Sequence, residues 1–114
     1  MRDDLARLLD IQDAIEQIEK YAVRGRAAFE EDPLIQVWIL HHVQVIGEAA
    51  RNLSASFRLR HPEVDWSEIV GTRNVLVHHY FGIDKDAVWR VVEQDLPELK
   101  RRATAILQAE QDRR

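Results

Sequence analysis

The chain has 114 residues and a formal net charge of −4, with 46% hydrophobic and 32% charged residues. This size and composition predict a single folded domain over residues 1–114 and exclude a disordered chain. The acidic balance disfavours a protein that coats nucleic acid by bulk electrostatics. The lack of cysteine excludes disulfides, thiol chemistry and Cys-based zinc sites. No apolar run reaches the roughly 20 residues of a membrane-spanning helix, so no membrane contact is predicted.

Apolar residues at spacings of three and four predict a first amphipathic helix, which begins after Asp3 or Asp4. Its inward stripe is Leu5, Leu8, Ile11, Ile15, Ile18 and Ala22. Gly25 is the expected C-terminal cap. Residues 27–31 should then form a short helical turn.

Asp32 and Pro33 predict the start of a second long helix, because proline fits the first helical position after an N-cap. This helix is expected to extend to about Leu53. Its predicted inward stripe is Leu34, Val37, Trp38, His41, Val45, Ile46 and Ala49. A looser helical segment over 54–60 should end at His61, because the following proline disfavours a helical predecessor. His61 is interpreted as loop surface and His41 as a packing residue.

Asp65 is the expected N-cap of a third main helix, with Glu68 three residues later. This helix should include the stretch 73–80 and end at Gly82.

Asp84 is the expected cap of the last helix, which Pro97 should kink or divide. Its predicted stripe is Val88, Val91, Val92, Leu96, Leu99, Ala103 and Ile106. The polar tail from Gln108 is expected to fray. Since no stretch alternates with period two, the predicted fold is all-α, an antiparallel bundle of four main helices with one or two short ones.

Residues 73–80 hold the densest group of chemically capable side chains. At about 100° per residue on an ideal helix, Arg73 and Tyr80 share one side. Asn74 and His78 share a side about 100–140° further round. One arc of the helix is therefore polar and reactive.

These residue types suit phosphoryl chemistry without a metal. A neutral His78 can take a proton from a ribose 2′-hydroxyl or give one to the leaving oxygen. Arg73 can hold a phosphate oxygen and stabilise the growing negative charge, and Asn74 can fix the tautomer of His78. Arg73 and His78 diverge by about 140° on one helix, so a second copy across a two-fold axis would bring them together better. On spacing alone, the favoured interpretation is structural: these polar side chains face solvent or hold a neighbouring helix.

Other motifs do not indicate a metal or cofactor site. The pairs His41-His42 and His78-His79 are sequence neighbours, which point about 100° apart on a helix and do not suit joint chelation. Neither an H-E-x-x-H motif nor a Glu-x-x-His motif is present. A glycine-rich phosphate loop is also absent. We therefore expect no metal and no cofactor.

With these residues the chain resembles the HepT-like toxins of the HEPN superfamily. Arg73, His78 and Tyr80 match the Arg-x4-His-x-Tyr motif of that family without a gap. Further similar stretches, spread over nearly the whole chain, are 25–29, 46–51, 61–66 and 88–97. Two departures are Thr72, where the family often has methionine, and His79, where it often has aspartate. We interpret His79 as a tolerated variation.

The resemblance implies a HEPN-like helical homodimer whose two motifs line one cleft. It implies a cytoplasmic, metal-independent endoribonuclease, the toxin of a type VII-like toxin–antitoxin pair, with Arg73 and His78 as catalytic residues. It also implies an MntA-like minimal nucleotidyltransferase antitoxin as partner, which neutralises the toxin by AMPylation of Tyr80. An adenylyl group there would add bulk and negative charge, repel RNA phosphate and occupy Arg73.

A function of a different class also fits the residues. In that hypothesis the chain is a non-catalytic helical module that binds a nucleotidyltransferase or a nucleotide, and the polar arc is a docking surface. The acidic net charge favours this alternative.

Overall fold

The computed structural model describes residues 3–76 and 82–113, with the backbone but not the side chains of 73–76. The described residues form α1 (Asp4–Ala22), α2 (Arg26–Glu31), α3 (Pro33–Arg51), α4 (Ala55–Arg60), α5 (Trp66–Leu76), α6 (Lys85–Arg90), the π-helical turn η1 (Val91–Asp95) and α7 (Leu96–Asp112). This order confirms the predicted all-α bundle of long helices joined by short ones.

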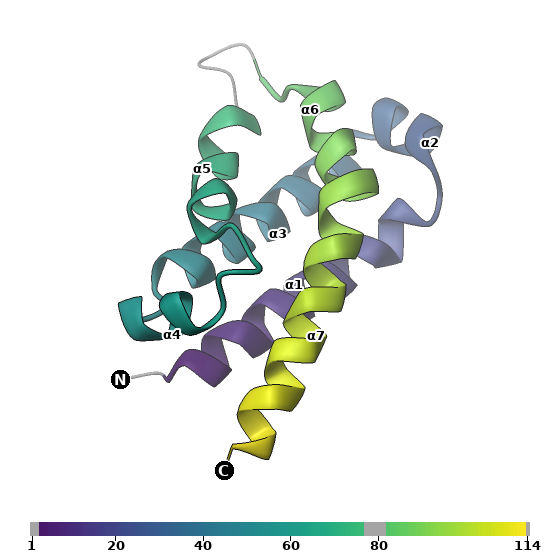
Figure 1. The fold of residues 1–114 in the computed structure, drawn as a ribbon. Coiled ribbons are helices and arrows are strands. Elements are labelled where there is room, and N and C mark those ends of the chain that lie inside the picture. Colours follow the sequence, from purple (N-terminus) through teal and green to yellow (C-terminus); the bar gives the residue numbers. More distant parts are fainter. Residues whose placement is uncertain (1–2, 77–81, 114) are drawn as a thin grey trace.

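Helix α3 is the centre of the bundle (Figure 1). It packs against α1 on one side and α5 on another, and α7 packs across α1. Short α2 packs against α3, and α6 contacts α5. The predicted stripes of the first and last helices are largely confirmed, with Leu8, Ile11, Val88 and Ala103 fully buried in the core. Helix α5, which carries the start of the 73–80 stretch, is thereby held against α3.

The cap of α1 agrees with the sequence. The carboxylate of Asp3 accepts a hydrogen bond from the backbone N–H of Ala6 at 2.8 Å. The next residue, Asp4, accepts hydrogen bonds from the backbone N–H and the hydroxyl of Ser54 at 2.8 and 2.7 Å. Gly25 follows α1 with a φ of 92°, in the region that favours glycine, but directly precedes α2.

The predicted inward stripe of α3 is partly wrong. Asp32 caps the helix as predicted, through a hydrogen bond from the N–H of Leu34 at 2.9 Å. However, Leu34 is 80% and Val37 60% exposed, and His41 is exposed as well. The observed core stripe is Ile35, Ile39, Val43, Ile46 and Ala50. The reason is that α3 is apolar around most of its circumference, so two apolar stripes with helical spacing are present. Packing against the neighbouring helices, not the sequence pattern of α3, determines which stripe is buried.

The last helix is divided, as the position of Pro97 predicts. Asp84 caps α6 by accepting from the N–H of Ala87 at 3.1 Å. The π-helical turn η1 then ends one residue before Leu96, and Pro97 occupies the first turn of α7. Proline cannot donate to the carbonyl one turn earlier, so regular α-helical bonding cannot cross this point.

The C-terminal tail differs from its prediction. Helix α7 continues to Asp112, well beyond Gln108, where fraying was expected. The side chain of Glu110 holds this end, because it accepts hydrogen bonds from Arg60 and His61 at 2.9 and 2.7 Å.

None of the described helices has the length and apolar character needed to cross a membrane.

Candidate functional site

The base of α5 is anchored by contacts around its N-terminus. Asp65 accepts a hydrogen bond from the N–H of Glu68 at 3.0 Å, which confirms it as the N-cap. The buried indole of Trp66 donates to the carbonyl of His61 at 3.0 Å. One turn further on, the hydroxyl of Thr72 donates to the carbonyl of Glu68 at 2.7 Å. The helix that leads into the 73–80 stretch therefore starts from a fixed base.

The predicted catalytic arc begins in the last described turn of α5. The backbone of Arg73 and Asn74 is helical, as predicted. Their side chains, and the whole of His78 and Tyr80, lie outside the described residues. The predicted arc and the contacts within it therefore stay a prediction. Gly82, the expected stop of this helix, has a φ of 99°, a conformation that favours glycine.

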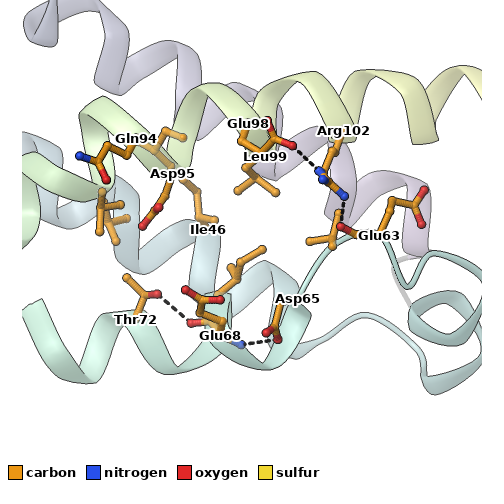
Figure 2. Close-up of a pocket in the computed structure, with 15 residues that line it drawn as sticks. Ile46, Glu63, Asp65, Glu68, Thr72, Gln94, Asp95, Glu98, Leu99 and Arg102 are labelled. Atoms are coloured by element: carbon orange, nitrogen blue, oxygen red, sulfur yellow. Dashed lines mark hydrogen bonds and ion pairs between the residues drawn. The ribbon is translucent and has the colours of Figure 1, made fainter.

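A groove of about 310 Å³ lies beside α5, between this helix and the η1–α7 segment (Figure 2). Its apolar surface includes Ile46 from α3, Ile69 from α5 and Leu99 from α7. Thr72 also lines the groove and directly precedes Arg73 in the chain. The groove therefore lies next to the start of the predicted motif on α5.

Acidic side chains dominate the charged part of this lining. The charged residues that line the groove in the described part of the chain are Glu63, Asp65, Glu68, Asp95, Glu98 and Arg102. The whole chain has 20 acidic residues and 16 lysines and arginines. Without these five carboxylates and this arginine, the two signs balance at 15 each. The lining thus carries an excess of negative charge that equals the net charge of the whole chain.

The one arginine of the lining is already bound there. The Nε–H of Arg102 donates to Glu98 at 2.6 Å, and another N–H of its guanidinium donates to the carbonyl of Glu63. The hydrogen bond from Arg102 lowers the pKa of Glu98 below its usual value, against partial desolvation, and the charge of Arg101 adds to the shift. Glu98 is therefore ionised at neutral pH.

The second polar cluster links α4 to the end of α7. His61 is only 8% exposed, so its interpretation as loop surface is wrong. Its Nε2 lies 2.7 Å from Glu110, which also accepts from Arg60 at 2.9 Å. Burial raises the pKa of Glu110, but the hydrogen bonds from Arg60 and His61 outweigh it and lower the pKa below its usual value. Proline after His61 indicated a loop correctly, but not that α7 would cover it. The available signal is that Glu110 follows the core residue Ile106 by one helical turn.

Within 3–76 and 82–113, no group of three or more His, Asp or Glu side chains could hold a metal ion. The rings of His41 and His42 meet edge to face with centroids 4.9 Å apart. The Nδ1–H of His42 donates to the carbonyl of Trp38 at 2.8 Å. One ring of this pair is therefore occupied by a backbone contact.

Comparison with known proteins identifies the relatives of this chain. A family profile described as "Ribonuclease HepT-like" matches residues 11–106. "Probable ribonuclease HepT" of Thermococcus cleftensis is 38% identical over 82% of this chain and 86% of its own length. "Putative RNase MJ1380" of Methanocaldococcus jannaschii is 35% identical over 88% of this chain and 93% of its own length. No solved structure matches the chain at a significant level.

Proposed function

Because the chain belongs to the HepT-like ribonuclease family, we propose that it is a metal-independent endoribonuclease with a composite active site formed by two copies. The family match over residues 11–106 carries this proposal, together with the Arg-x4-His-x-Tyr motif at 73–80. The relatives named above as ribonucleases support the same activity.

The proposed reaction uses an internal nucleophile of RNA. His78 takes the proton from a ribose 2′-hydroxyl, the 2′-oxygen attacks the adjacent phosphorus, and the bond from phosphorus to the 5′-oxygen breaks. The leaving 5′-oxygen receives a proton from water, and the imidazolium of His78 returns its proton to solvent, so each site uses one His78 together with the Arg73 of the second copy. Arg73 binds a non-bridging oxygen and stabilises the negative charge that grows on the phosphoryl group. Asn74 orients the imidazole of His78, and no step needs a metal.

Two features of the described residues support a dimer that binds RNA. The exposed face of α3 presents Leu34 and Val37 to solvent. No Asp, Glu, Lys or Arg occurs anywhere in 33–47, so this face is suited to a second uncharged surface. The acidic excess is confined to the groove lining, and the rest of the chain is electrically balanced. The net charge of −4 is therefore a weak argument against an RNA substrate.

The biological role that we propose is the toxin of a type VII-like toxin–antitoxin pair in the cytoplasm. Its partner would be an MntA-like minimal nucleotidyltransferase that transfers AMP to Tyr80. The phenolic oxygen of Tyr80 attacks the α-phosphorus of ATP, loses its proton, and pyrophosphate leaves. The product carries a negative phosphodiester on Tyr80, seven residues after Arg73 in the sequence, where it would repel RNA phosphate.

The test is cleavage of a defined RNA by purified protein in the presence of EDTA. Wild-type protein should cut, and Arg73→Ala and His78→Ala should each lower the rate by roughly a hundredfold or more, because a positioned acid–base group and a charge stabiliser each contribute about that much. The matched control is His79→Ala, which removes the neighbouring imidazole and should keep activity. Tyr80→Phe should also keep activity but prevent AMP uptake, measured by intact mass.

Equal cleavage by wild type and His78→Ala would contradict the ribonuclease proposal. A wild-type chain that never cuts RNA, yet binds a nucleotidyltransferase as tightly as His78→Ala does, would favour the non-catalytic interaction module.

A further inference from the structure

The groove beside α5 has the surface of a docking site. Its deeper part is apolar, with Val64, Leu96 and Leu99 each less than a tenth exposed. The two sides of the groove come from α5 and from the η1–α7 segment, and α3 lies beneath them (Figure 2). An apolar surface between two helices is the usual shape of a groove that accepts an amphipathic segment.

The charges around this apolar surface select a basic occupant. Glu68 stands on the α5 side and Asp95 on the η1 side (Figure 2). Neither carboxylate has a hydrogen bond or an ion pair within the described part of the chain. Because the lining holds five carboxylates and one arginine, it repels RNA and attracts cations.

The bound guanidinium of Arg102 indicates the type of cation that fits. It bridges the carboxylate of Glu98 and the carbonyl of Glu63, and the apolar side chain of Leu99 lines the same groove. Near Glu68 and Asp95 the groove likewise combines carboxylates with an apolar surface. An arginine or lysine of a bound partner could therefore pair its charge with a carboxylate and lay its aliphatic part on the apolar surface.

We propose that this groove binds a basic amphipathic segment of a partner protein that controls the nuclease. Arginine or lysine side chains of the segment pair with Glu68 and Asp95, and an apolar side chain between them contacts Ile46 and Ile69. This inference deepens the proposed function, because it assigns a docking place to the partner of the same site. The docked segment lies against Thr72 and is therefore adjacent to the start of the catalytic motif.

The experiment measures peptide binding to His78→Ala protein by calorimetry, so that it needs neither RNA cleavage nor AMP transfer. The probe is a synthetic alanine-based helical peptide with arginine and leucine on one face. Glu68→Gln/Asp95→Asn should weaken its affinity by about tenfold, the sum of two solvent-exposed ion pairs. The matched control is Asp13→Asn/Glu16→Gln, which removes two carboxylates from the exposed face of α1 and should leave the affinity unchanged.

Two further probes separate other sources of positive charge. A scrambled peptide with the same composition should bind more weakly, because it cannot present arginine and leucine on one face. Spermine, a small polycation, should not displace the amphipathic peptide at equal concentration. The proposal is overturned if the groove and control variants bind equally, if the scrambled peptide or spermine binds as well as the probe, or if the probe does not bind.

Discussion

At the scale of single residues, the hydrogen bonds from Arg60 and His61 to Glu110 hold the C-terminal end of α7 in place. They join the loop before α5 to the last turns of α7. His61 and Glu110 are 49 residues apart, and neither follows a local sequence pattern. This is why the sequence suggested a surface histidine and a frayed tail, whereas the caps at Asp3, Asp32 and Asp84 were predictable from two or three adjacent residues.

Glu110→Gln should lower the free energy of unfolding at neutral pH by about 1–3 kcal/mol, because it removes a mostly buried carboxylate that accepts two hydrogen bonds. The pKa of Glu110 is lower in the folded state than its usual value. Its contribution is therefore present above the unfolded-state pKa and is lost as pH falls through the folded-state pKa. Urea unfolding from pH 7 down to pH 3 should show wild type and variant converging. Glu16→Gln, on the exposed face of α1, is the control. A difference in the free energy of unfolding that stays constant across this pH range would contradict the stabilising role of the Glu110 carboxylate.

At the scale of elements, the bounds of α3 could be predicted from the sequence, but its buried face could not. Its bounds and its cap were predictable, because Asp32-Pro33 is a local signal. Its buried face was not, because Leu34 and Val37, three residues apart, fit an apolar helical stripe as well as Ile35 and Ile39, which are four apart. Which stripe is buried depends on where α1 and α5 lie, and that information is absent from the pattern of one helix. The apolar stripe left outside is the surface that we assign to self-association.

Leu34→Glu/Val37→Glu should convert the proposed dimer into a monomer without lowering the thermal stability of the monomer. Both side chains are exposed, so charge there opposes association rather than folding. Sedimentation velocity over a range of concentrations measures the outcome. Leu59→Glu is the control, because Leu59 is an equally exposed leucine on α4. A double variant that stays dimeric would place the interface on another face.

At the scale of the whole molecule, the account depends on where the charge and the motif lie. The acidic excess lines a groove on one side of α5, and the motif begins at Arg73 in the last described turn of the same helix. Helix α5 therefore carries the surface that we assign to a basic partner and leads into the residues that we assign to RNA cleavage. The fold class and the family were predictable from sequence, because helical periodicity and the 73–80 motif are local. The groove was not, because its lining comes from separate elements that meet only in the folded chain.

The central claim is that Arg73 of one copy works with His78 of the other. Heterodimers with a different tag on each chain can be purified and assayed on RNA in EDTA. A heterodimer of Arg73→Ala with His78→Ala should regain about half of the wild-type rate, because one of its two symmetric Arg–His combinations is intact. A heterodimer of wild type with Arg73→Ala/His78→Ala should be inactive, because each combination lacks one residue. The opposite pattern, an inactive first heterodimer and an active second one, would show that each chain carries a complete site and would contradict the account.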